Sequence, residues 1–190
     1  TEAPDMGDMG GAGAEVLVAN VQEPAASLSP TFISTSSLTK AYGLSGLRAG
    51  WILASPEVTE RCRRVRDLVD AVGSFPSELL ALIAFENLDS LRARARGILE
   101  PNFRILDEFV ESRPDLEWVR PKGGSVGFPR VPGMTDVSSF VKRLREAYET
   151  GVVPGRFFEA PGHFRVAMGG RKEILEKGLE RLAGALDKEL

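Results

Sequence analysis

The sequence predicts an α/β fold, with short strands first, then a long helical stretch, then a layer in which helices and strands alternate. Three observations support this prediction. Runs rich in β-branched and aromatic residues lie at 32–36 and 51–54, apolar residues recur at three- and four-residue spacing between 56 and 112, and short strand-like runs return after residue 114. We expect a domain boundary inside the helical stretch, near residues 90–112.

The helical stretch is divided by its prolines. Residues 55–57 (Ser-Pro-Glu) suit the N-cap and first turn of a helix, and residues 74–76 (Ser-Phe-Pro) end that helix. A second and more buried helix is expected over residues 77–87. A third is expected over residues 90–112, where Pro101 predicts a kink or a division into two helices.

The elements after residue 114 are short until the last helix. Paired strands are expected at 116–119 and 125–128, around a Pro-Lys-Gly-Gly turn. The other expected elements are a helix at 137–148, strands at 152–153 and 164–168, and a closing helix at 172–190. At the start of the chain, residues 4–14 are predicted to be a flexible lead-in and residues 15–21 a short strand or a helical turn.

The composition excludes several classes of protein and of functional site. The chain has 190 residues and a net charge of −3, so neither a broadly basic nucleic-acid-binding protein nor a membrane-surface protein is expected. The single cysteine, Cys62, is expected in the core, and the single histidine, His163, at the surface or in a hydrogen bond. These counts exclude an intrachain disulfide framework and argue against a metal site. The longest apolar run, residues 79–85, is too short to cross a membrane, and no leader pattern is visible, so a cytoplasmic location is expected.

One short segment carries the residues for a specific chemistry. Lys40 follows the first predicted strand, with the hydroxyl of Ser37 three residues before it and the guanidinium of Arg48 eight residues after it. A lysine amine forms a Schiff base with a carbonyl cofactor. A hydroxyl and a guanidinium both bind phosphate, and glycines between them let the backbone come close to a ligand.

The segment resembles the pyridoxal-phosphate lysine motif of the class I/II aminotransferases, which are fold-type-I enzymes. The matching positions are Ser37, Lys40, Gly43, Leu44, Gly46, Arg48 and Gly50. Two further stretches are similar to the family's pattern: the Pro-x-Gly-Gly turn at 121–124, and Val153-Pro154-Gly155 together with the later strand that carries Arg165. The resemblance covers residues 25–190.

The resemblance implies an activity and a role for each site residue. Lys40 would hold pyridoxal 5'-phosphate as a Schiff base and shuttle the α-proton of the substrate. Ser37 and Arg48 would bind the cofactor phosphate, and Arg165 the α-carboxylate of the substrate. An amino group would pass between an amino acid and a 2-oxo acid, in an enzyme that is a homodimer when intact and needs no metal.

The resemblance also implies a domain arrangement. Residues 1–95, flexible over 1–14, would be the end of the large cofactor-binding domain, with helices on a mixed or parallel sheet. Residues 96–190 would be a small α+β C-terminal domain. The family places the aspartate that pairs with the pyridinium nitrogen, and a Gly-rich phosphate loop, before the lysine strand, yet only residues 1–39 precede Lys40. We therefore expect the chain to be the C-terminal part of a longer enzyme. Within this chain, Asp5 and Asp8 are only weak substitutes for that aspartate.

Two alternatives stay open at this stage. A fragment that keeps the fold could be inactive and serve as a non-catalytic dimerisation or structural domain. Pyridoxal-phosphate-dependent decarboxylases and lyases share the lysine motif, and nothing in the sequence separates them from aminotransferases.

Overall fold

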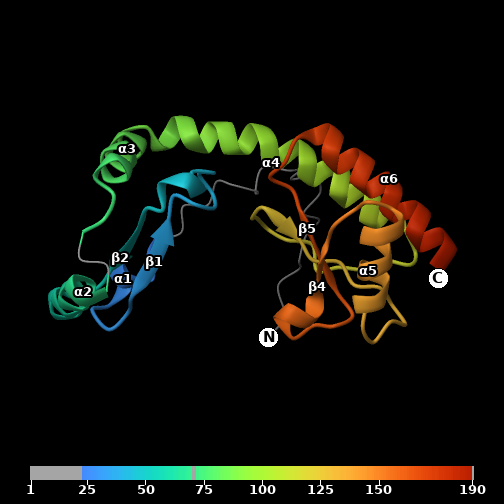
Figure 1. Ribbon diagram of the computed structural model, residues 1–190, viewed down its shortest axis with the longest axis horizontal. Helices are drawn as coiled ribbons and strands as arrows, with labels where there is room; N and C mark the ends of the chain where they lie inside the picture. Colours follow the sequence, from blue (N-terminus) through green and yellow to red (C-terminus); the bar gives the residue numbers. More distant parts are fainter. Residues whose placement is uncertain (1–22, 70–71, 190) are drawn as a thin grey trace, which may run out of the picture.

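The computed structural model describes residues 23–69 and 72–189. These residues form two lobes that lie on one side of a long helix, α4 (Leu88–Glu111) (Figure 1). The N-terminal lobe contains α1 (Ala25–Leu28), β1 (Ser34–Ser37), β2 (Gly50–Leu53), α2 (Pro56–Val69) and α3 (Phe75–Glu86). The C-terminal lobe contains β3 (Val126–Gly127), α5 (Ser138–Ala147), β4 (Val153–Pro154), β5 (Phe164–Ala167) and α6 (Lys172–Glu189). The predicted α/β class is confirmed.

The two strands of the N-terminal lobe lie where the sequence predicts them, within two residues. β1 and β2 pair antiparallel, with Ser34 opposite Leu53 and Ser37 opposite Gly50. Residues 38–49 turn the chain back on itself between the strands, so that β2 runs beside β1 in the opposite direction. All strand pairs in the described part of the chain are antiparallel, so the parallel pairing expected for this lobe is not found there.

Helix α2 begins as the sequence predicts. The hydroxyl of Ser55 accepts a hydrogen bond from the backbone N–H of Val58 at 3.4 Å, which caps the first turn ahead of Pro56. The helix has no fully buried residue, and its outer face carries short ion pairs such as Arg61 with Glu57 at 2.7 Å. The expectation that Cys62 lies in the core is therefore wrong, since its side chain is only half-buried.

Helix α3 is much more exposed than its sequence predicts. Only its two small residues, Ala81 and Ala84, are buried, and they pack with Leu38 from the turn between β1 and β2. Most of the large side chains of the helix lie outside this cluster, and those of Leu80 and Leu82 are 51% and 56% exposed. The predicted burial is wrong for the described residues because these contain too little apolar surface to cover the other faces of the helix.

Helix α4 runs unbroken through Pro101, so the predicted division into two helices is wrong. A proline inside a helix removes one backbone hydrogen bond and crowds the carbonyl four residues earlier. That earlier residue is Gly97, which has no side chain to add to the crowding. Within the described ranges, no helix is both long and apolar enough to span a membrane.

The C-terminal lobe has a three-stranded antiparallel sheet with β5 at its centre, between β3 and β4. Phe164 and Val166 of β5 face a core that α4, α5 and α6 cover (Figure 1). The largest fully buried side chains of this core are those of Leu106, Leu144, Phe164, Met168, Leu182 and Leu186. The helices predicted for this region are confirmed within one or two residues.

The predicted strand pair at 116–119 and 125–128 is mostly wrong. Glu117 forms a single bridge with Arg130, which lies beyond the predicted second strand, and the two residues exchange backbone hydrogen bonds of 3.1 and 2.7 Å. Pro121 and Pro129 have no N–H to donate to a ladder, which limits pairing on both sides of the turn. Residues 126–127 pair instead with β5.

An unusual polar residue ties α4 to the end of β5. Asn102 is 1% exposed, and its side-chain nitrogen donates to the carbonyl oxygens of Met168 and Gly170, at 2.7 and 2.8 Å. Both amide protons of one side chain are therefore used to satisfy backbone carbonyls where β5 leads into α6.

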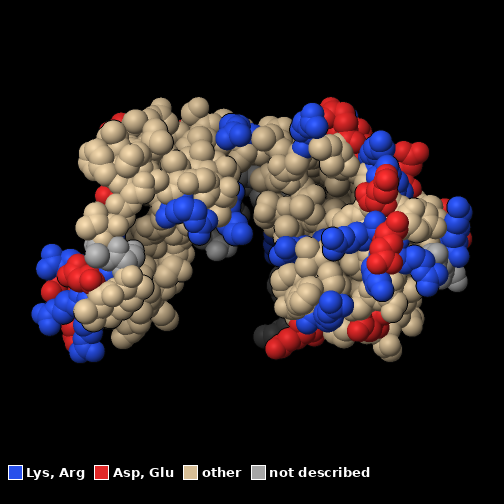
Figure 2. Space-filling view, viewed as in Figure 1, with Lys and Arg blue, Asp and Glu red and all other residues tan. Residues whose placement is uncertain are grey.

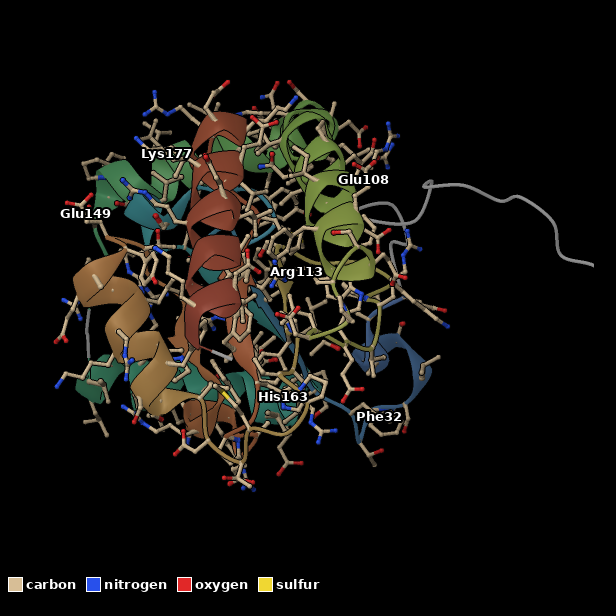
Figure 3. All side chains as sticks on the ribbon, turned by 90° about the vertical axis from the view of Figure 1, so that its right-hand side faces the viewer. Phe32, Glu108, Arg113, Glu149, His163 and Lys177 are labelled. Atoms are coloured by element: carbon tan, nitrogen blue, oxygen red, sulfur yellow. The ribbon has the colours of Figure 1, made fainter. Side chains whose placement is uncertain are left out.

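An ion pair fixes the end of α4 against α6. Arg113 lies between the two helices (Figure 3) and donates two hydrogen bonds to Asp115, at 2.8 and 2.6 Å, and one to Asp187 at 2.6 Å. The hydrogen bonds from Arg113 lower the pKa of Asp115.

We expect Arg113→Gln to lose about 1 kcal/mol of the free energy of unfolding at neutral pH. Because the folded pKa of Asp115 is lowered, its contribution is present above its unfolded pKa of about 3.9 and is lost as the pH falls through the folded pKa. Urea denaturation from pH 7 to pH 2 should therefore show a weaker pH dependence in Arg113→Gln than in Arg130→Gln, which removes an exposed pair with Glu117. Equal pH dependence in the two variants would contradict this account.

Candidate functional site

Lys40 lies on a tight turn directly after β1. Three backbone hydrogen bonds fix this turn: Leu38 N–H to Ala49 O at 3.1 Å, Leu44 N–H to Leu38 O at 2.9 Å, and Gly43 N–H to Lys40 O at 3.1 Å. The side chain of Leu38 is fully buried beneath the turn and anchors it to α3. These contacts fix the backbone at Lys40. Its side chain is exposed, so its amine stays accessible.

Ser37 and Arg48 lie on the two arms of the same turn. Ser37 is opposite Gly50 in the strand register, and Arg48 is two residues before Gly50. The arms come so close that a β-carbon at Gly50 would lie 2.9 Å from the carbonyl oxygen of Ser36. The structure thus places Ser37, Lys40 and Arg48 on one hairpin turn.

Among the described residues, the polar groups of this turn have few partners. The Ser37 hydroxyl accepts one hydrogen bond, from Thr39 N–H at 3.3 Å, and Arg48 donates one, to Ser45 O at 3.4 Å. Neither Lys40 nor Arg48 forms an ion pair with any carboxylate of the described chain. An amine, a hydroxyl and a guanidinium without acidic partners are a donor set that fits a phosphorylated aldehyde.

Arg165 lies in the other lobe, on β5. Its neighbours Phe164 and Val166 face the core, so the alternation of the strand puts Arg165 on the opposite face, where it is half-buried. Its guanidinium lies 4.9 Å from the ring centre of Phe158, and no described carboxylate pairs with it. A half-buried arginine without an acidic partner suits an anionic ligand such as a carboxylate.

Aromatic side chains support Arg165, and the sequence alone does not identify them. Phe158 packs edge-on against Phe128 with ring centres 5.6 Å apart, and Phe128 stacks on His163 at 4.9 Å. His163 is half-buried, and its Nδ1 atom is buried without a hydrogen-bond partner in the described structure. His163 thus lies partly at the surface, as expected, and stacking on Phe128 holds its ring. The only sequence signal for Phe158 is the Phe-Phe pair before the Arg165 strand.

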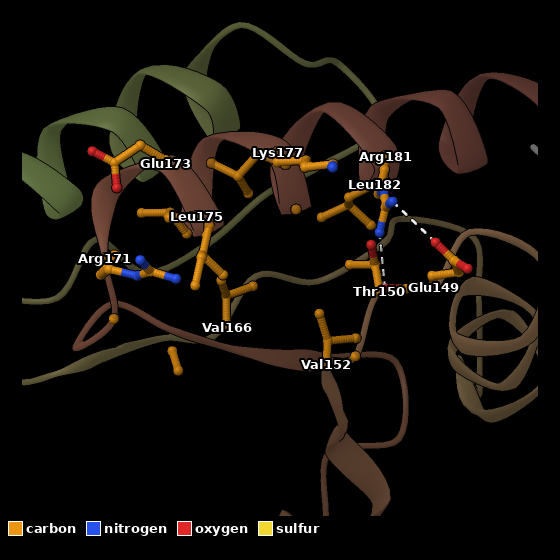
Figure 4. Close-up of a pocket in the computed structure, with 16 residues that line it drawn as sticks. Glu149, Thr150, Val152, Val166, Arg171, Glu173, Leu175, Lys177, Arg181 and Leu182 are labelled. Atoms are coloured by element: carbon orange, nitrogen blue, oxygen red, sulfur yellow. Dashed lines mark hydrogen bonds and ion pairs between the residues drawn. The ribbon is translucent and has the colours of Figure 1, made fainter.

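The space-filling view shows a hollow between the lobes, with Lys and Arg side chains along its borders (Figure 2). A separate cavity of about 670 Å³ lies between α6 and the sheet of the C-terminal lobe (Figure 4). Arg181 crosses its edge with hydrogen bonds of 3.1 Å to the backbone and the carboxylate of Glu149. None of Ser37, Lys40, Arg48 and Arg165 lines this cavity. In residues 23–69 and 72–189 there is no group of three or more His, Cys, Asp or Glu side chains arranged to hold a metal.

Comparison with known proteins places the chain in a family. The model of the family "Aminotransferase class I and II" matches residues 7–182. The chain is 32% identical over 155 residues to capreomycidine synthase of Streptomyces vinaceus, covering 81% of this chain and 40% of that protein. The chain thus spans about two fifths of that relative's length.

Two solved structures resemble the chain closely. A PLP-dependent aminotransferase from Streptococcus suis superimposes with a TM-score of 0.80 and 32% identity, covering 84% of this chain and 42% of that one. A PLP-dependent cyclase, OrfR, superimposes with a TM-score of 0.78 and 28% identity, covering 83% of this chain and 44% of that one. With the family model matching most of its length, the chain belongs to the class I and II aminotransferases.

Proposed function

We propose that this chain carries the lysine-bearing part of a pyridoxal-phosphate-dependent aminotransferase, which transfers an amino group between an amino acid and a 2-oxo acid. The observation that carries the proposal is the Lys40 turn. Its backbone is fixed by three hydrogen bonds, its amine is accessible, and its two arms carry a hydroxyl and a guanidinium that pairs with no carboxylate in the described part of the chain.

The proposal assigns a role to each site residue. Lys40 Nζ would hold the cofactor covalently and would also carry the proton to and from the α-carbon of the substrate. Ser37 Oγ and the guanidinium of Arg48 bind the cofactor phosphate. Pyridoxal phosphate supplies the electron sink when it is bound. Arg165 binds the α-carboxylate of the substrate, and Phe158 holds its guanidinium in place.

The domain division at residues 95/96 and a homodimeric intact enzyme are further parts of this proposal. Two separate apolar clusters support the division. The cluster around Leu38 includes α4 residues up to Leu91, and the cluster of the C-terminal lobe begins on α4 at Leu99. Asp5 and Asp8 lie outside the described residues, as do the predicted lead-in at 4–14 and the element at 15–21. The cytoplasmic location stays a prediction.

A second candidate function is a cyclising or eliminating reaction on the same cofactor. The names capreomycidine synthase and PLP-dependent cyclase, on relatives 32% and 28% identical to this chain, favour it. The intact, cofactor-loaded protein separates the two candidates when it is incubated with amino acids. Transamination releases a 2-oxo acid and consumes an amino acceptor, whereas cyclisation requires no acceptor.

The cofactor role of Lys40 is tested by titrating the chain with pyridoxal phosphate and following the absorbance change of the lysine adduct. We expect saturable binding by the unmodified chain and at least about tenfold weaker binding by Lys40→Arg, which keeps the charge but not the nucleophilic amine. Lys122→Arg, on the exposed turn at 121–124, is the matched control and should bind as the unmodified chain does. Equal binding by both variants would contradict the proposal.

A further inference from the structure

We propose that Arg94, on helix α4, is an additional phosphate-binding residue of the Lys40 turn. This inference rests on the proposed cofactor role of Lys40 and extends the phosphate site beyond Ser37 and Arg48. Nothing in the local sequence around Lys40 identifies Arg94, because it lies more than fifty residues later and reaches the turn only through the fold.

The first support is the position of the Arg94 guanidinium. Its Nη1 atom lies 4.0 Å from the place that a β-carbon would occupy at Gly43. Gly43 adopts a φ of +68°, a conformation that favours glycine, and its N–H donates to the carbonyl of Lys40. The guanidinium therefore lies beside the same tight turn that carries Lys40.

The second support is the way α4 is held along this turn. Leu88 and Leu91 of α4 pack against the cluster around Leu38, beneath the turn. On the next part of the helix, the Tyr42 side chain raises the pKa of Arg92, and Arg92 pairs with Asp89 at 2.7 Å. These contacts place α4 against the turn independently of the Arg94 side chain.

The third support is charge. Arg92 is paired, but Arg94 forms no ion pair with a described carboxylate, and the same holds for Lys40 and Arg48. Three cationic side chains around one turn repel one another unless an anion lies between them. A phosphate group carries up to two negative charges and several acceptor oxygens, and guanidinium groups bind it in a bidentate, permanently charged fashion.

The test compares pyridoxal phosphate with pyridoxal, which has the same aldehyde but no phosphate. Dissociation constants for both probes are measured on the unmodified chain, on Arg94→Gln and on Arg96→Gln, after each variant is shown to unfold at the unmodified midpoint in urea. Arg96 is the matched control, because two residues along a helix place its exposed side chain on the other side.

We expect Arg94→Gln to weaken pyridoxal phosphate binding by about fivefold or more while the affinity for pyridoxal is unchanged. Arg96→Gln should change neither affinity. Equal affinities of Arg94→Gln and the unmodified chain for pyridoxal phosphate, or equal weakening for both probes, would overturn the role of Arg94. If neither probe forms an adduct on Lys40 in the unmodified chain, the proposed function fails as well, so the two failures are distinguishable.

Discussion

Replacing Gly155 by alanine should destabilise the C-terminal lobe by at least about 3 kcal/mol. A β-carbon at this position would overlap the carbonyl oxygen of Ala160 and would lie 2.6 Å from that of His163. Both obstacles are backbone atoms that the fold fixes, since Gly155 N–H donates to His163 O at 2.7 Å and Ala160 N–H donates to Gly155 O at 3.1 Å. The chain can therefore admit the methyl group only by breaking the junction between β4 and β5.

The urea midpoint of Gly155→Ala, compared with that of Gly151→Ala, measures this effect. Gly151 is the matched control because a β-carbon there meets no atom within 4 Å, so its midpoint should move little. The junction also fixes the position of β5, which carries Arg165. The affinity for ligands that bind Arg165 should therefore fall together with stability. Equal midpoints for the two variants would show that the junction yields more easily than its geometry indicates.

Replacing Asn102 by aspartate should destabilise the protein by about 3 kcal/mol or more at neutral pH. The amide of Asn102 donates to two carbonyl oxygens in a buried site. A carboxylate there would be desolvated and would face those oxygens with no proton to share. The introduced carboxyl group should therefore have a raised pKa in the folded state.

The pH dependence of the stability loss in Asn102→Asp tests whether the buried carboxylate causes it. A carboxyl group with a raised folded pKa binds more protons in the folded state, so stability falls as the pH rises from about 4 toward the folded pKa. The loss in Asn102→Asp should thus be largest at pH 7 and smaller near pH 4. Asn87→Asp is the control, since the Asn87 amide also donates to a carbonyl, that of Ile83 at 2.8 Å, but on the surface. A pH-independent loss would contradict the account.

The fold was predictable where the signal is local. The Ser-Pro start of α2, the amphipathic pattern of α5 and α6, and the apolar alternation of β5 all depend on near neighbours in sequence. The burial of α3 was not predictable, because an apolar sequence shows which side chains favour burial but not whether a partner covers them. The β3 pairing depended on Pro129 and on competition from a distant strand, which periodicity does not reveal.

The candidate site was likewise predictable only where its residues are close together in sequence. Ser37, Lys40 and Arg48 were identified by their spacing within one short stretch of sequence, and they lie on one hairpin. The contact of Phe158 with Arg165 and the approach of Arg94 to Gly43 arise from packing between elements that are far apart in the chain. Such contacts leave no pattern in a single sequence.

The central claim is that Lys40 is the lysine that holds pyridoxal phosphate. The most direct measurement is to incubate the chain with limiting pyridoxal phosphate, reduce with borohydride and map the modified lysine by peptide mass spectrometry. The account predicts that the pyridoxyl group is found predominantly on Lys40 and that phosphate competes with its formation. Label spread evenly over surface lysines such as Lys122 and Lys142, with no preference for Lys40, would contradict it.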